Sequence, residues 1–147
     1  MPGVVLDVNV LVSSVIAPLG FPRQIFSAWR TGRYPLITSA GIIAELEEKL
    51  ALPRIARRYR ATPELALDTI TLLRNHATLV PVPAPEQRRV TGDPEDDLVL
   101  ATGRLARAEY LVTGDQALLD LGQYEGMRII SPRQFVAILD TRARQPG

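Results

Sequence analysis

The sequence predicts an α/β fold in three layers, with helices on both faces of a central and mostly parallel sheet. Short apolar runs rich in β-branched residues alternate with segments of helical periodicity, as in chains that build parallel sheets. The first run, residues 4–8, is apolar except for Asp7, which is typical of a strand covered on both faces. Three later segments open with threonine, aspartate or serine followed by proline, a pattern that favours capped helices.

The expected strands and helices follow one another along the whole chain. Strands are predicted for residues 4–8, 35–38, 78–80, 110–113 and 127–130. Helices are predicted for residues 21–30, 40–50, 63 onward, 94–107, 116–121 and 132 onward, with a basic helical turn at residues 54–60. Ser39 is the expected cap of the second helix, whose apolar side chains form one stripe: Ile42, Ile43, Leu46 and Leu50.

One domain is expected over residues 1–140, because a chain of 147 residues can bury one hydrophobic core but not two. The proline-rich residues 81–85 predict a surface loop within that domain, and residues 141–147 a disordered tail. The apolar residues 4–16 are interrupted by Asp7 and Asn9 and follow no basic leader. We therefore expect neither a signal peptide nor a membrane span, and the lack of cysteine favours a cytoplasmic protein.

The residue types that are missing or rare exclude several chemistries. The absence of cysteine excludes a thiol nucleophile, a disulfide framework and a cysteine-ligated metal. His76 is the only histidine, so an imidazole cluster is excluded, and its place in a helix favours a solvated side chain. Lys49 is the only lysine, which argues against Schiff-base chemistry. If the protein is an enzyme, carboxylates are its expected catalytic groups.

The net charge of +1 predicts no strong overall attraction to nucleic acid. Basic residues are nevertheless concentrated in the helical turn at residues 54–60, where Arg54, Arg57 and Arg58 share one helical face. This face is either a contact for phosphate groups or a partner, or an ordinary solvated surface.

Asp7 is the most informative single residue, because every neighbour in residues 4–12 except Asn9 is apolar. A buried carboxylate without a partner would cost several kcal/mol or would become protonated. Asp7 therefore needs a partner, which is either a cation at the carboxyl end of a central strand or the N-terminus of a following helix that it caps.

A second group of acids lies at residues 93–97, where four of five residues are acidic. Asp93 is the expected cap of the helix that begins at Pro94, and Asp96 has the spacing to complete the cap. Capping does not need four acids, so the excess also favours cation binding. Asp115 follows a buried strand and either joins such a site or caps the helix at Gln116.

The helix at residues 40–50 carries a further candidate acid. Glu45 and Glu47 both flank its apolar stripe, so periodicity does not choose between them. Four converging carboxylates would repel by about 4 kcal/mol for each pair at 4 Å and an effective dielectric constant of 20. They would have to share protons or bind a cation, and an all-oxygen set favours Mg²⁺ or Mn²⁺, which promote displacement at phosphorus.

These segments, taken in order, resemble PIN-domain nucleases, and most closely the toxin subgroup of toxin–antitoxin systems. The resemblance extends from residue 4 to about residue 139 and rests on four motifs, at residues 5–12, 39–45, 93–97 and 111–115. It implies a PIN-like fold and a catalytic, metal-binding set of four acids: Asp7, Glu45, Asp96 and Asp115. Asp93 and Asp97 are typical of the subgroup and rank below Asp96.

The resemblance also implies a function and partners. Asn9 and Thr113 match polar positions of the family, whereas Val8 stands where the family has threonine or serine, so no hydroxyl contact is expected there. The implied activity is Mg²⁺- or Mn²⁺-dependent hydrolysis of RNA phosphodiester bonds. The implied partners are an RNA substrate, an antitoxin protein and a second copy of the chain.

Three other functions are weighed against this one. A receiver-like phosphoacceptor also has an acidic pocket, but it needs a lysine near a late strand end, and Lys49 lies in an early helix. A haloacid-dehalogenase-type phosphatase needs an aspartate where Asn9 stands. A non-catalytic PIN-like module that binds RNA or protein would be free to lose its acids, and this chain retains them.

Overall fold

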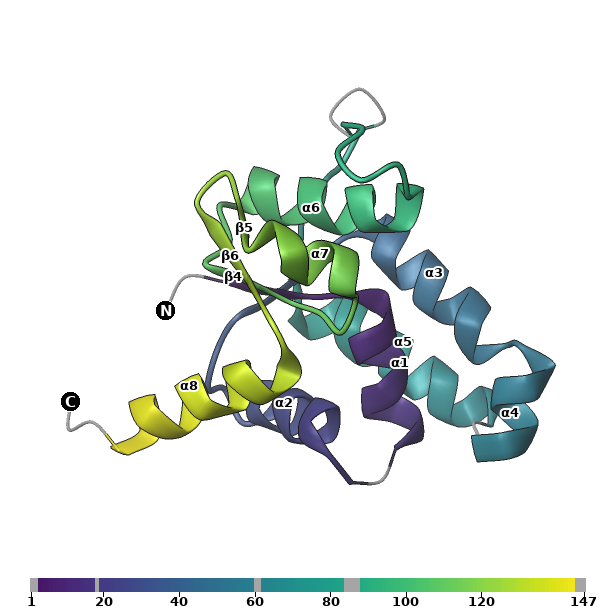
Figure 1. Cartoon of the computed structure of the whole chain (residues 1–147). Helices are drawn as coiled ribbons and strands as arrows, with labels where there is room; N and C mark the ends of the chain where they lie inside the picture. The colour runs from purple at the N-terminus through teal and green to yellow at the C-terminus, as the bar shows by residue number, and fades with distance from the viewer. Residues whose placement is uncertain (1–2, 18, 60–61, 84–87, 145–147) are drawn as a thin grey trace.

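The computed structural model describes residues 3–17, 19–59, 62–83 and 88–144 (Figure 1). Its strands are β1 (Val4–Leu6), β2 (Leu36–Thr38), β3 (Thr78–Leu79), β4 (Tyr110–Val112), β5 (Gln123–Tyr124) and β6 (Met127–Ile130). Its helices are α1 (Val8–Ile16), α2 (Phe21–Arg30), α3 (Ala40–Leu50), α4 (Pro53–Tyr59), α5 (Pro63–His76), α6 (Pro94–Ala106), α7 (Gln116–Leu121) and α8 (Pro132–Arg144).

The strands form one sheet in the order β3-β2-β1-β4-β6-β5, in which only the pairing of β5 with β6 is antiparallel. From β1 the chain moves outward through β2 and β3, and it then returns to the other side of β1 with β4. The strand order therefore reverses between β1 and β4, whose register pairs Leu6 with Val112. In open α/β sheets, ligands bind beyond the carboxyl ends of the strands at such a reversal.

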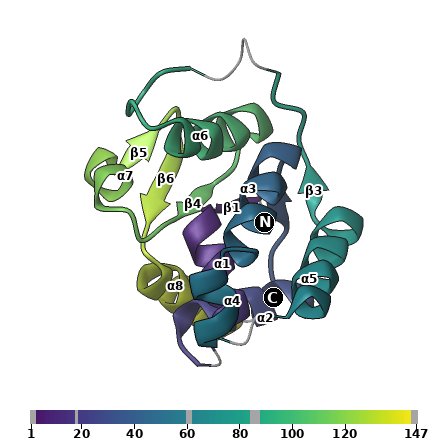
Figure 2. The same ribbon diagram turned by 90° about the vertical axis from the view of Figure 1, so that its right-hand side faces the viewer.

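Helices cover both faces of the sheet, so the predicted α/β fold with a mostly parallel sheet is confirmed. Figures 1 and 2 show α6 over one face and α1, α2 and α8 over the other. On the α6 face, Gly103 lies so close to the sheet that a Cβ atom there would be 2.2 Å from the Sδ of Met127. α3 packs against α1, α5 and α6 and so connects the two helical layers.

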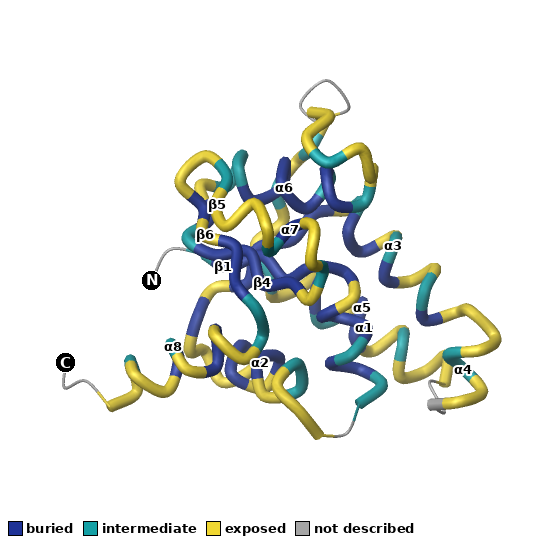
Figure 3. Tube along the Cα trace, in the orientation of Figure 1, coloured by how far each residue is buried: buried dark blue, intermediate teal, exposed yellow. Residues whose placement is uncertain are grey.

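The core lies in the sheet and on the inner sides of these helices, as the dark blue segments of Figure 3 show. All three residues of β1 are at most 1% exposed, as expected of a strand covered on both faces. Phe135 of α8 is fully buried, and its ring lies 5.1 Å from that of Tyr34 and 6.0 Å from that of Tyr110. The first contact is edge-on and the second is tilted, and the second joins α8 to the sheet because Tyr110 belongs to β4.

Two predicted boundaries are wrong by two residues or more, whereas the others differ from the structure by at most one residue. The first strand ends at Leu6, because the carboxylate of Asp7 accepts the backbone N–H of Asn9 and starts α1 at Val8. The predicted tail is helical to Arg144, since α8 continues past residue 140. The reason is a tertiary contact, in which Arg142 pairs with Glu109 at 3.0 Å and lies over the ring of Tyr110. Residues 145–147 lie outside the described part of the chain.

One strand was not predicted at all. β5 has two residues, and it joins β6 through a turn at Glu125 and Gly126, both with positive φ (50° and 85°). Such a turn favours hairpins, but its usual sequence signal is asparagine or aspartate before glycine, which this chain lacks. Within the predicted proline-rich loop, residues 81–83 have no regular structure, whereas Pro85 lies outside the described residues.

No single helix in the described residues is both long and apolar enough to cross a membrane. α1 and α2 reach that length and composition only as a pair that is bent by 92°.

Candidate active site

Asp7 follows β1 at the point where the strand order reverses, and only 5% of its surface is exposed. Its Oδ1 accepts the backbone N–H of Asn9 at 2.6 Å, which caps α1, and its Oδ2 accepts the hydroxyl of Thr113. Burial raises the pKa of Asp7, and these two hydrogen bonds oppose the rise. Of the two partners predicted for Asp7, the N-terminus of a following helix is thus observed at α1. The charge of Asp115 also acts on Asp7, so a cation would be stabilised beside it.

Thr113 and Asp115 follow the neighbouring strand β4. The fully buried hydroxyl of Thr113 donates to Asp7 and accepts the backbone N–H of Asp115 at 3.0 Å, so it connects the ends of the two strands. Asp115 in turn accepts the backbone N–H of Ala117 at 2.8 Å and caps α7. The negative charge of Asp115 contributes to the raised pKa of Asp7, which shows that the two carboxylates lie close together.

Asp96 reaches the same place from the first turn of α6 and is 8% exposed. Burial raises its pKa to about 7, helped by a hydrogen bond with Asp115 and by the charges of Asp115, Asp93 and Asp7. The hydrogen bond and the charges that act on Asp96 place it beside Asp115 and Asp7, in a set that we call the inner group (Asp7, Asp96 and Asp115).

The other two aspartates of residues 93–97 stabilise the start of α6 and the loop that precedes it. Asp93 caps α6 by accepting the N–H of Glu95 at 2.9 Å, as predicted, but its own N–H donates to Thr91, so Asp96 does not complete the cap. Asp97 is 5% exposed, and its Oδ1 accepts the N–H and the hydroxyl of Thr91 at 2.8 and 2.9 Å. Asp97 thus fastens the preceding loop to α6 instead of facing the inner group.

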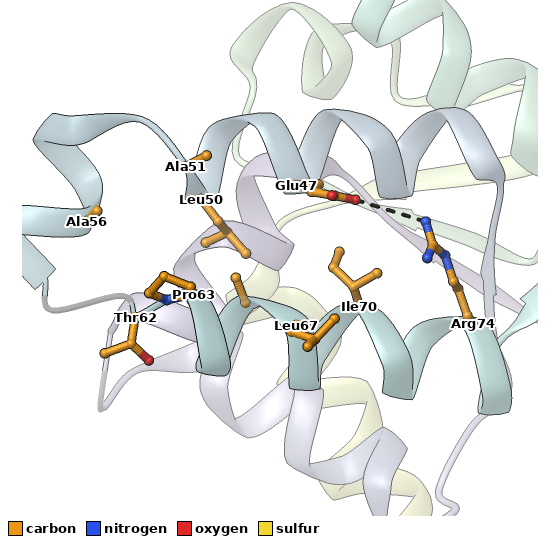
Figure 4. Close-up of a pocket in the computed structure, with 10 residues that line it drawn as sticks. Glu47, Leu50, Ala51, Ala56, Thr62, Pro63, Leu67, Ile70 and Arg74 are labelled. Carbon is orange, nitrogen blue, oxygen red and sulfur yellow. Dashed lines mark ion pairs between the residues drawn. The ribbon is translucent and has the colours of Figure 1, made fainter.

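The structure distinguishes Glu45 from Glu47 on α3. Glu47 is exposed and faces α5, where its carboxylate lies 3.9 Å from Arg74 across a groove of about 370 Å³ lined mostly by apolar side chains (Figure 4). Glu45 is half-buried and forms a hydrogen bond with Glu95 of α6, which raises its pKa more than burial does. Glu45 therefore lies beside Glu95 of α6, and its assignment to the metal-binding set by resemblance stays a prediction.

Lys49 and Glu95 were not predicted as site residues. The Nζ of Lys49 donates to Oε2 of Glu95 at 3.0 Å and to Oδ1 of Asn9 at 3.2 Å. The bond from Lys49, together with the bond to Glu45, lowers the pKa of Glu95. The i, i+4 spacing of Glu45 and Lys49 places both on one helical face and was the available sequence signal. We call Asn9, Glu45, Lys49 and Glu95 the outer group.

The inner group suits a hard divalent cation by its chemistry. Among the described residues, no three acidic or histidine side chains form a ready-made metal cage. Mg²⁺, however, is commonly held by one or two carboxylates together with water and substrate phosphate. The charges of Asp115, Asp93 and Asp7 help to raise the pKa of Asp96, a repulsion that a cation would relieve, and no inner-group carboxylate forms an ion pair with a described residue. His76 lies exposed at the last position of α5.

Comparisons with known proteins agree with this fold. The PIN-domain family matches the chain over residues 3–117. A search of curated proteins found no significant match. One similar structure is a chain of VapBC2 from Rickettsia felis, which was solved bound to a DNA fragment from the VapBC2 promoter. Its TM-score is 0.61 and its sequence identity 12%, and the likeness covers 88% of this chain and 98% of that chain. FitAcB from Neisseria gonorrhoeae is similar with a TM-score of 0.53 and 15% identity over 88% and 98% of the two chains.

The double role of Asp115 predicts opposite effects of two substitutions. Asp115→Asn removes the charge but keeps an oxygen that can cap α7, whereas Asp115→Ala removes both. In the presence of EDTA, we expect the asparagine variant to be at least as stable as wild type and the alanine variant to be less stable than it by about 1 kcal/mol. Urea unfolding measures both, with Asp120→Asn, an exposed acid of the same helix, as the control. Equal destabilisation by the two substitutions would contradict the electrostatic part of this assignment.

The raised pKa of Asp96 predicts how stability without metal depends on pH. The unfolded chain loses this proton near the ordinary value of 3.8, whereas the folded chain retains it to about 7, so ionisation destabilises the fold across that interval. From about pH 5 to about pH 8, wild type should lose up to about 3 kcal/mol relative to Asp96→Asn. Unfolding at both pH values in EDTA measures the difference, and parallel curves for the two proteins would contradict it.

Proposed function

Because the chain belongs to the PIN-domain family, we propose that it is a Mg²⁺- or Mn²⁺-dependent endoribonuclease and the toxin of a toxin–antitoxin pair. The observation that carries the proposal is the convergence of Asp7, Asp96 and Asp115 from three distant segments. They meet where the strand order reverses, and they form no ion pair with a described residue. Capping accounts for Asp7 and Asp115 singly, but it does not account for a third buried carboxylate beside them, because the three charges repel unless protons or a cation neutralise them.

The residues of the inner group would hold the ion, and Glu45 would support it from the outer group. A bound divalent cation lowers the pKa of a water molecule and stabilises the oxygens of an in-line displacement on phosphorus. Thr113 orients Asp7 through its hydroxyl, and the bond to the N–H of Asn9 prevents the carboxylate from rotating. Burial raises the pKa of Asp96 to about 7, so a proton would compete with the ion for this carboxylate, and affinity for the ion would increase with pH.

Two further features support the choice of RNA and of an antitoxin as partners. Arg54 and Arg57 of α4 are exposed, as side chains that contact phosphate groups must be. The two similar structures, VapBC2 and FitAcB, are toxin–antitoxin complexes, and their likeness covers nearly all of the matched chains. We propose an antitoxin for this chain by analogy, and the resemblance extends the proposal to a homodimer.

A receiver-like phosphoacceptor needs a lysine beside its carboxylates, and Lys49 does lie beside acids in the folded chain. It approaches from α3, however, and binds Asn9 and Glu95 instead of the carboxylate that follows β1. Membership of the PIN-domain family favours the nuclease over this alternative.

Ribonuclease activity should depend on a divalent cation and on the inner group. We expect the purified chain to cleave single-stranded regions of structured RNAs in Mn²⁺ or Mg²⁺ and to be inactive in EDTA. Asp96→Asn should lower the rate by more than about 100-fold, because loss of even a supporting group around a metal costs 10–100-fold. Gel analysis of labelled RNA measures both, with Asp120→Asn as an active control. Cleavage in EDTA would refute the mechanism, and RNA binding without cleavage would indicate a non-catalytic module.

An antitoxin should inhibit by placing a basic side chain among the inner-group carboxylates, since such a charge replaces that of the metal ion. The candidate to test is the protein encoded by the reading frame next to this one. We expect saturating Mn²⁺, and separately Asp7→Asn, to weaken its binding at least tenfold, which is about 1.4 kcal/mol. Calorimetry measures the affinity, and Asp140→Asn, an exposed acid of α8, should not change it. Affinity that does not respond to Mn²⁺ and to Asp7→Asn would place inhibition elsewhere.

A further inference from the structure

Lys49 is the only lysine of the chain, and its ammonium group is held in a defined place. Its Nζ donates to the carboxylate of Glu95 at 3.0 Å and to the side-chain oxygen of Asn9 at 3.2 Å, and its side chain is 23% exposed. Glu95 belongs to α6 and Asn9 to α1, so this one side chain connects α3 to both of these helices. A lysine that merely solubilised α3 would extend into water and would not bind both neighbours.

The packing of α3 fixes the direction of Lys49. Leu46 and Leu50 are at most 2% exposed and hold the apolar side of the helix in the core. Glu45 lies one turn before Lys49 and faces the same acid of α6, Glu95, whereas Glu47 faces α5 and pairs with Arg74 (Figure 4). The fold therefore places a negative and a positive side chain of α3 together beside the carboxylates.

The inner and outer groups differ in how their charge is balanced. In the outer group, the ammonium of Lys49 directly contacts Glu95, and Glu95 contacts Glu45. In the inner group, no carboxylate forms an ion pair with any residue that the structure describes. Asn9 connects the two groups, because its N–H binds Asp7 and its side-chain oxygen binds Lys49.

A lysine ammonium is a compact positive charge with three donors, and in this respect it can take the place of a small cation. Sites that use two divalent ions hold them about 3.5–4 Å apart between shared carboxylates. In this chain Glu95, one of the two acids that could hold a second ion, already pairs with an ammonium group, and the other, Glu45, lies within reach of the same charge. A second ion would have to displace Lys49 or bear its repulsion together with that of the first ion.

We propose that Lys49 is a positioning residue that occupies the outer group and thereby restricts the site to one divalent cation, held by Asp7, Asp96 and Asp115. The inference rests on the proposed metal-dependent function and goes beyond it by assigning the number of ions and the residue that sets it. It also assigns Glu95 and Asn9 as the residues that hold the ammonium in place.

The number of Mn²⁺ ions bound per chain tests this inference without any substrate. Equilibrium dialysis, with free Mn²⁺ measured by electron paramagnetic resonance, should give one ion for wild type. Lys49→Gln should bind two ions, the second more weakly, and Lys49→Met serves as a second neutral variant if the first does not fold. Lys49→Arg keeps the positive charge and should bind one ion. Arg74→Gln removes a cation from the other side of α3 and should also bind one.

A double variant shows where the second ion binds. Lys49→Gln combined with Glu95→Gln should return to one ion, because the outer group then lacks an ionised carboxylate to hold it. Two ions in wild type, or one ion with unchanged affinity in both neutral variants, would overturn the role of Lys49 while leaving the nuclease proposal standing. No bound Mn²⁺ in wild type would refute the proposed metal dependence, and the inference with it.

Discussion

The parallel pairing of β1 with β4 is the constraint on which the site depends. The backbone N–H of Asp7 donates to the carbonyl of Val112 at 3.0 Å, so the ladder continues up to the first carboxylate. This pairing brings Thr113 opposite Asp7, and its hydroxyl then connects the two strand ends. Because the strand order reverses between these two strands, the chain continues from them toward opposite edges of the sheet, and ligands bind at such a point in open α/β sheets. The remaining acids come from α3 and α6, which pack around that point.

Helix N-termini make this accumulation of acids tolerable. Asp7, Asp93 and Asp115 each accept a backbone N–H at the start of a helix, where the partial positive charge favours an anion. An aspartate can therefore cap a helix and also face the inner group. Asp7 does so by accepting the N–H of Asn9 with Oδ1 and the hydroxyl of Thr113 with Oδ2. Asp96 is no cap, and its pKa is correspondingly raised to about 7 by burial and by Asp115. Asp96 is thus the inner-group carboxylate that caps no helix and has its pKa raised to about 7.

Position within a motif does not decide what an acid does. Asp96 and Asp97 are adjacent and both buried, yet Asp96 lies beside Asp115 whereas Asp97 binds the loop residue Thr91. The same holds on α3, where Glu45 faces α6 and Glu47 faces α5. In both pairs a change of about 100° or 200° around the helix axis directs the side chain to a different neighbour. Lys49 belongs with Glu45 for the same reason, one full turn further along.

The sequence by itself determined the alternation of strands and helices, the caps at Ser39, Thr62 and Asp93, and the presence of Asp7 and Asp115 at strand ends. These features depend on local pattern and on the chemistry of caps and turns, which neighbouring residues fix. Only the tertiary structure decided the last turn of α8 and the two-residue strand β5. It also decided that Asp96 and Asp97 have different neighbours, and that Lys49 contacts Glu95 and Asn9. Each of these depends on a partner that lies far away along the chain or on the far side of a helix, and sequence spacing carries no information about which partner that is.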